Sequence, residues 1–163
     1  MKSDKSTAPP AAELQWLPDA DRGCFICQAV AGKADREALV VDRTDTAIVI
    51  LNRFPYNNGH LLVAPRFHRA RLEQLSTAEQ TGLMTEITAM VERIERLMQP
   101  EGFNIGLNLG RVAGAGLPGH LHWHIVPRWS GDTSFMPVTA GVNVIPQSLD
   151  ALWELLTSHG GQP

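Results

Sequence analysis

Three histidines alternate with large apolar residues at positions 120–126, which read HLHWHIV. A period of two is typical of a half-buried strand, so His120, His122 and His124 are expected to project from one face while the apolar residues enter the core. Side chains two positions apart on a strand lie roughly 6.5–7 Å apart. Neighbouring imidazoles can therefore share one metal ion or one phosphate, and the three are expected to divide their tasks instead of forming one three-histidine metal site.

The middle histidine of this row is a candidate nucleophile. A neutral imidazole can attack phosphorus through one ring nitrogen when a hydrogen bond fixes the N–H on the other. The product is a phosphoramidate, which divides one difficult displacement into two easier steps. His122 is best placed for the attack, and its neighbours on the same face can stabilise the non-bridging oxygens of the phosphate.

A second candidate site is the pair Cys24 and Cys27, which are the only cysteines among the 163 residues. The Cys-x-x-Cys spacing suits a redox pair or one half of a zinc site. Redox pairs usually stand in a parallel strand-helix-strand unit, which this sequence does not contain, so zinc is favoured. Only histidines are available to complete a tetrahedral set, and His68 follows directly on a predicted strand that could hold it firmly.

Glycines gather immediately before the histidine row. Between positions 110 and 119 they stand at 110, 114, 116 and 119. Such a loop can bring backbone N–H groups, including that of Gly116, close to a phosphate, although the chain lacks the Gly-Lys-Ser/Thr of a P-loop. Turn formation alone would also explain these glycines, but their position beside three imidazoles favours phosphate binding.

Composition limits the class of protein. Apolar residues make up 44% and charged residues 19% of the chain, which is the balance of a globular domain with a real core. The net charge of -3 argues against a general nucleic-acid binder. No segment approaches the roughly 18 apolar residues of a membrane span, and the first ten residues lack the apolar run of a secretory signal. We therefore expect a cytoplasmic protein.

The elements that must position the candidate residues follow from the hydrophobic pattern. Ser76 and Glu79 form a capping-box motif at the start of the one long helix. Helices are expected at 25–31, 77–99 and 148–157, and strands at 38–42, 46–51, 60–64, 103–109 and 120–126. These elements describe an α+β domain with a five-stranded antiparallel sheet, one long helix and short helices. Residues 1–12 are expected to form a disordered leader, and residues 13–163 a single domain.

The histidine row resembles the signature of the histidine-triad (HIT) family of nucleotide hydrolases and transferases. The resemblance extends from Cys24 to about Arg128. Residues 51–55, LNRFP, followed by 58–60, NGH, and residues 102–110, GFNIGLNLG, are similar to the branch that contains the Fhit hydrolases and bacterial diadenosine tetraphosphate phosphorylases. The resemblance implies the HIT-like fold, with a C-terminal extension from about residue 130, and a homodimer whose two sheets join into one.

The same resemblance assigns roles to individual residues. It implies that His122 is the nucleophile that takes a nucleoside monophosphate group, and that His124 contacts the phosphate and assists. Asn52 and Asn108 match positions that help to hold the nucleotide, and His60 matches a histidine behind the triad. The implied activity is cleavage of a nucleoside phosphate anhydride, such as a dinucleoside polyphosphate, through a covalent nucleotidyl-histidine.

Zinc-containing relatives imply the ligand set of a structural zinc ion. The four matching residues here are Cys24, Cys27, His68 and the first histidine of the row, His120. Four protein ligands would leave no open position for a water molecule, which counts against a zinc hydrolase.

Two departures from the family pattern leave an alternative open. Many relatives carry Ser or Gln in the loop before the triad, whereas this chain has GAGLPG at 114–119, and Trp123 is larger than the usual Val or Leu. Backbone N–H groups would have to serve in place of the missing side chain. The alternative is a nucleotide-binding sensor or interaction module that keeps the scaffold without useful turnover.

Overall fold

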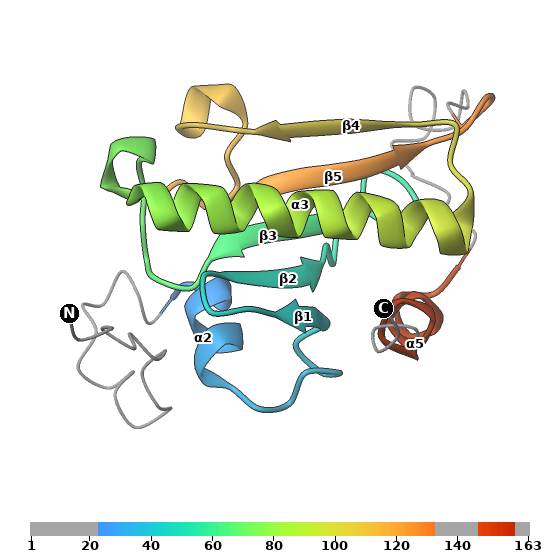
Figure 1. The fold of residues 1–163 in the computed structure, drawn as a ribbon, viewed down its shortest axis with the longest axis horizontal. Coiled ribbons are helices and arrows are strands. Elements are labelled where there is room, and N and C mark those ends of the chain that lie inside the picture. The colour runs from blue at the N-terminus through green and yellow to red at the C-terminus, as the bar shows by residue number, and fades with distance from the viewer. Residues whose placement is uncertain (1–22, 133–146, 159–163) are drawn as a thin grey trace.

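The computed structural model of this chain describes residues 23–132 and 147–158. Its strands form one antiparallel sheet in the order β1-β2-β3-β5-β4 (Figure 1). The strands are β1 (Val40–Arg43), β2 (Ala47–Leu51), β3 (Leu61–Pro65), β4 (Gly102–Leu107) and β5 (Trp123–Arg128). The expected α+β class with a five-stranded antiparallel sheet is confirmed. The leader predicted at 1–12, and residues 133–146 of the predicted extension, lie outside the described residues.

The long helix α3 (Thr77–Met98) crosses one face of the sheet (Figure 1). Ser76 begins it with the expected capping box, because its hydroxyl accepts from the Glu79 N–H while the Glu79 carboxylate accepts from the Ser76 N–H. Its inner face buries Leu83, Ile87, Met90 and Ile94 in the core. Within the described ranges, no helix combines the length and apolar character that crossing a membrane requires.

Helix α2 (Phe25–Ala31) carries the cysteine pair and is attached to the sheet through Arg43 of β1. The Arg43 guanidinium donates to the carbonyl oxygens of Ala29, Val30 and Gly32 and to the carboxylate of Asp35. The last carbonyls of a helix lack partners within the helix, so this side chain both caps α2 and fixes its position.

Helix α5 (Leu149–Ser158) forms close to where the sequence predicts it and packs beside β1. Its Trp153 indole N–H donates to the Val40 carbonyl oxygen at 2.7 Å. Two 3-10 turns, η2 (Leu72–Gln74) and η3 (Arg111–Ala113), lie in the connections before α3 and after β4.

The strand expected from position 120 begins only at Trp123. The Leu121 N–H donates to the Arg69 carbonyl oxygen, and the His120 carbonyl accepts from the imidazole of His122. Backbone groups before Trp123 are therefore used by a loop and by a side chain instead of a neighbouring strand. Period-two alternation continues through this segment, but it does not by itself create a strand ladder.

The register of the sheet decides which side chains share a face. Leu62 pairs with both Ile50 and His124, and Gly106 on the edge strand β4 also pairs with His124. Because directly paired residues point to the same side of a sheet, these four residues share one face. Ile125, the next residue along β5, points to the other face and is completely buried. The sheet thus presents His124 on a face with a glycine beside it.

Candidate active site and metal centre

The four residues predicted to bind zinc converge at one place. One potential ligand atom from each of Cys24, Cys27, His68 and His120 lies within 4.8 Å of the others. Cys24 is the N-cap of α2 and Cys27 lies in its first turn, while His68 follows β3 and His120 precedes β5. Three separate segments of the chain therefore contribute to one group that could hold a metal ion.

Hydrogen bonding selects which nitrogen of His120 faces the thiols. The Nε2–H of His120 donates to the Pro65 carbonyl oxygen at 2.8 Å, which leaves the Nδ1 lone pair free. That Nδ1 lies 3.3 Å from Cys24 Sγ and 3.5 Å from Cys27 Sγ. His68 Nδ1 lies 3.2 Å from Cys27 Sγ. Tetrahedral zinc would hold nitrogen and sulfur about 3.5 Å apart, so the donor spacing fits that ion.

The Cys24 thiol is completely buried, and its surroundings favour the thiolate. Its pKa is lowered to about 3, chiefly by hydrogen bonding from the Cys27 side chain, against the effect of burial, with a further contribution from His120. A buried thiolate is costly unless a cation compensates its charge. The thiolate and the two imidazole lone pairs therefore form a chemically suitable set for a divalent metal.

The middle histidine of the row is held by the backbone of the first. His122 Nδ1–H donates to the His120 carbonyl oxygen at 2.8 Å, and the His122 side chain is nearly buried. A carbonyl oxygen can only accept, so Nδ1 carries a proton, and in the neutral ring the lone pair resides on Nε2. The neutral ring therefore has the tautomer that an attacking imidazole needs.

A chain of hydrogen bonds fixes the third histidine of the row in the opposite tautomer. The Tyr56 backbone N–H donates to His60 Nδ1 at 3.0 Å, so His60 carries its proton on Nε2. His60 Nε2–H then donates to His124 Nδ1 at 2.9 Å. His124 must consequently be protonated at Nε2, which is buried and lacks a hydrogen-bond partner in the described part of the chain.

The lowered pKa values of His60 and His124 agree with two neutral rings. Burial, assisted by the charges of His124 and His122, lowers the pKa of His60 to about 3. Burial also lowers the pKa of His124, with a smaller effect from His122. Both rings are therefore neutral near pH 7, and the N–H of His124 lies on the buried Nε2.

A pocket of about 550 Å³ lies beside the histidines. Its walls come from α2, the segment that follows it, the end of β2 and Leu62 of β3. Asn52 connects this pocket to the hydrogen-bonded pair of His60 and His124, because it lines the pocket and its Nδ2 lies 3.3 Å from His60 Nδ1. The exposed rings of Phe25 and Phe54 stand at its walls, so a flat apolar group can enter next to a polar side chain.

A second cavity, of about 640 Å³, lies between α3, α5 and the end of β5. Its lining includes Met98 and Trp129, and among the described residues neither this lining nor that of the smaller pocket contains a histidine. It is bordered by Asp132 and Gln147, the residues that flank the undescribed segment 133–146. The smaller pocket is the better candidate binding site because its lining includes Asn52, which contacts His60, and Leu62, which pairs with His124.

Asn108 and Gly116 lie in the glycine-rich connection between β4 and β5. The Asn108 amide donates to the Gly114 carbonyl oxygen at 3.4 Å, which closes the loop on itself. A Cβ added at Gly116 would have no neighbouring atom within 4 Å, so its backbone faces open space. The role of both residues in binding a nucleotide remains a prediction.

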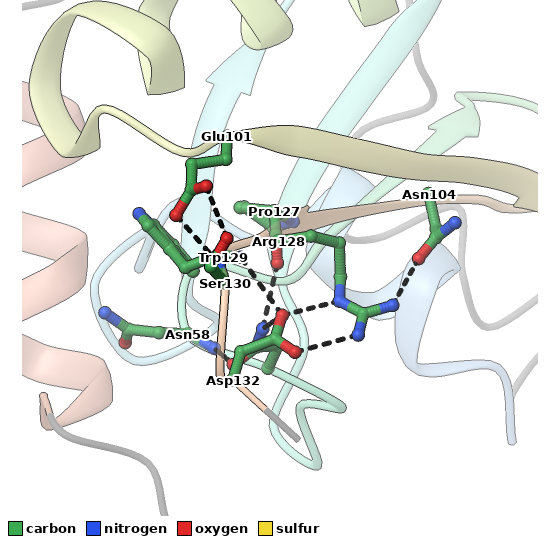
Figure 2. A network of polar contacts seen from close by, with 9 residues as sticks. Asn58, Glu101, Asn104, Pro127, Arg128, Trp129, Ser130 and Asp132 are labelled. Atoms are coloured by element: carbon green, nitrogen blue, oxygen red, sulfur yellow. Dashed lines mark hydrogen bonds and ion pairs between the residues drawn. The ribbon is translucent and has the colours of Figure 1, made fainter.

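Sequence reasoning did not identify Tyr56 or the contacts that hold its loop. Asn57 donates through its side chain to the Pro127 carbonyl oxygen at 3.0 Å and to Asp132 Oδ2 at 2.8 Å. Asp132 in turn binds the Arg128 guanidinium through both carboxylate oxygens, and Arg128 also reaches Asn104 on β4 (Figure 2). These contacts fasten the loop 52–60 to the end of β5. From the sequence, roles were assigned only to Asn52 and His60 at the two ends of this loop, and its attachment to β5 was not predicted.

Comparison with known proteins identifies the family that the histidine row resembles. The family model described as "HIT domain" matches residues 33–131. AP-4-A phosphorylase of Mycobacterium tuberculosis H37Rv is 44% identical over 131 residues, which are 80% of this chain and 67% of that protein. A HIT-like protein of Methanocaldococcus jannaschii is 33% identical over 109 residues, covering 67% of this chain and 81% of that protein.

A solved structure shares the fold. It is that of a Zn-bound histidine triad family protein from Mycobacterium smegmatis, with a TM-score of 0.66 and 21% identity, over 85% of this chain and 93% of that one. The residues matched by the HIT family model, 33–131, include the sheet, the long helix and the histidine row. This chain therefore belongs to the HIT domain family.

Proposed function

We propose that this protein is a nucleotide hydrolase or transferase that cleaves a nucleoside phosphate anhydride through a nucleotidyl group on His122. The observation that carries the proposal is the hydrogen bond from His122 Nδ1–H to the His120 carbonyl, which leaves the Nε2 lone pair available. The 44% identity to a protein named AP-4-A phosphorylase favours a dinucleoside polyphosphate such as diadenosine tetraphosphate as the substrate.

In the first step, His122 Nε2 attacks the α-phosphorus of a nucleotide whose nucleoside occupies the pocket beside Asn52. The new N–P bond forms as the P–O bond to the leaving polyphosphate breaks, and the leaving oxygen takes the electron pair. The imidazole becomes cationic during this attack, and the His120 carbonyl stabilises the charge through the Nδ1–H. His124 Nε2–H donates to a non-bridging phosphate oxygen once ligand binding exposes this buried nitrogen, which would satisfy its unpaired N–H.

In the second step, water or inorganic phosphate attacks the phosphorus and releases neutral His122. Water yields a nucleoside monophosphate and phosphate yields a nucleoside diphosphate. Asn52, Asn108 and the backbone at Gly116 are proposed to hold the ribose and phosphates. The glycine loop would supply N–H groups where relatives use Ser or Gln.

We further propose that Cys24, Cys27, His68 and His120 bind one structural zinc ion. The donor spacing and the buried thiolate support this, and zinc occurs in a protein of the same fold. The ion would hold α2 against the start of β5 and orient the His120 carbonyl. A cytoplasmic location, where thiols stay reduced, would keep both cysteines available as ligands.

A homodimer is proposed on the edge strand β4. This strand pairs only with β5 within the described sheet, and Ile105 on it is exposed. An unpaired strand with an exposed apolar side chain is suited to pairing with a second copy.

The nucleophile can be tested by comparing two histidine variants. His122→Ala should lower kcat on diadenosine tetraphosphate by about 10⁴-fold or more, because no group replaces Nε2. His124→Ala should lower kcat by about 10²–10³-fold, because it removes one donor to the phosphate. Both proteins should keep the wild-type melting temperature within a few degrees. Full activity of His122→Ala would refute covalent catalysis, and tight nucleotide binding by the wild type with no product would favour the sensor alternative.

Metal analysis tests the zinc site. Protein expressed in metal-replete medium should contain about one zinc per chain, and Cys27→Ser should bind it far more weakly. Loss of zinc should also reduce kcat with little change in KM, because the His120 carbonyl would lose its fixed orientation toward His122. Wild-type protein without zinc would contradict the proposal, as would zinc retained at full occupancy by Cys27→Ser.

Acid stability tests the neutral state of His60. Its pKa is about 3 in the folded protein and near 6.5 when unfolded, so protonation favours unfolding. The stabilisation is fully present above pH 6.5 and is lost as the pH falls from 6.5 toward 3. Between pH 7 and pH 5 this residue alone should reduce the free energy of unfolding by about 2 kcal/mol.

The matched variant is His60→Gln, whose amide can still donate toward His124 but does not titrate. Urea unfolding at pH 7 and pH 5 should show a smaller loss of stability in His60→Gln than in the wild type, by about 2 kcal/mol. An equal loss in both proteins would show that His60 is not the group that titrates.

A further inference from the structure

The ring of Tyr56 lies directly against the histidine pair but remains open to solvent. Its centroid lies 4.8 Å from that of His60 and 5.9 Å from that of His124, and it is nearly parallel to the His124 ring, at 21°. The residue is nevertheless 61% exposed. One face of the phenol ring is therefore covered by imidazole, and the ring retains a large accessible surface beside the group proposed to bind phosphate.

The backbone around Tyr56 is held by hydrogen bonds at Tyr56 itself and at the next residue. Its own N–H is bonded to His60 Nδ1 at 3.0 Å. The next residue, Asn57, is fastened to Pro127 and Asp132, and Asp132 is held by Arg128 (Figure 2). An aromatic ring on a segment that is already ordered can bind a ligand without paying the entropy of ordering the loop.

The pocket beside Asn52 and the ring of Tyr56 are separate binding surfaces on the same loop. Of the loop that joins β2 and β3, the pocket lining includes Asn52, Arg53 and Phe54, whereas Tyr56 stands outside it against His124. A dinucleoside polyphosphate bound with its α-phosphate at His122 and His124 must extend beyond the histidines with its remaining phosphates and second base. Tyr56 is the exposed aromatic side chain in contact with the ring of His124.

We propose that Tyr56 is a stacking platform for the second nucleobase of a dinucleoside polyphosphate, the base carried by the leaving group. This inference rests on the proposed function and assigns a binding role to a residue outside the histidine row. The bound base would extend a stack of imidazole and phenol rings. Stacking requires a flat aromatic face and discriminates little between nucleobases. Tyr56 would therefore favour dinucleoside substrates without selecting one purine over another.

A different role for the same ring would be to shield His60 and His124 from water. A shield would act on every substrate equally, because it would maintain the neutral imidazoles that the chemistry uses. A platform would act only on substrates that carry a second base. Two substrates with the same phosphate chain therefore separate the roles: diadenosine tetraphosphate, and adenosine 5′-tetraphosphate, which lacks the second adenosine.

The experiment measures kcat/KM on both substrates for the wild type, Tyr56→Ala and Tyr56→Phe. Tyr56→Ala should lower kcat/KM for diadenosine tetraphosphate about tenfold and leave that for adenosine tetraphosphate within about twofold. Tyr56→Phe should keep both values, because stacking does not need the hydroxyl. Phe54→Ala, which removes an exposed ring from the pocket wall of the same loop, should lower both values by a similar factor.

Equal losses on both substrates in Tyr56→Ala, with a changed pH profile, would overturn the platform and indicate a shield. No loss on either substrate would also overturn it. Binding of both compounds to the His122→Ala protein, with and without Tyr56→Ala, decides the matter independently of turnover. If the wild type cleaves neither compound, the proposed function fails, while selective weakening of diadenosine tetraphosphate binding would still support the stacking role.

Discussion

The position of one proton on each histidine depends on backbone groups, and the proposed chemistry depends on those positions. The carbonyls of Pro65 and His120 and the N–H of Tyr56 each have a single hydrogen-bonding sense. They place the His120 lone pair toward the thiols, the His122 lone pair on the nitrogen away from the His120 carbonyl, and the N–H of His124 on Nε2. Three chemically identical side chains thus differ in which nitrogen carries the proton.

The proposed metal centre and the proposed transfer site are joined through His120. Its ring faces Cys24 and Cys27, while its carbonyl orients the neighbouring His122. The Arg43 side chain holds the helix that supplies both cysteines. A change at the metal centre would reach the proposed nucleophile through two residues of backbone, with no rearrangement of the sheet. This short connection explains how a structural ion could influence catalysis without contacting the substrate.

Local patterns predicted most of the fold, and the resemblance predicted the grouping of Cys24, Cys27, His68 and His120. The capping box at Ser76 and Glu79 is a short-range signal, and α3 begins where it predicts. The start of β5 could not be predicted, because the Leu121 N–H is taken by Arg69, which is distant in sequence. The role of the Tyr56 N–H depends on the fold of a loop that Asp132 fastens from far along the chain. Residue types therefore indicated the chemistry, while the tautomers required the tertiary contacts.

The most direct measurement is a long-range ¹H–¹⁵N NMR correlation spectrum of the imidazole groups in ¹⁵N-labelled protein near pH 7. The two ring nitrogens of a neutral histidine have distinct shifts according to which one carries the proton. His122 should be protonated at Nδ1, and both His60 and His124 should be neutral and protonated at Nε2. A His122 ring protonated at Nε2 would contradict the proposed nucleophile, because its lone pair would then face the His120 carbonyl instead of the substrate.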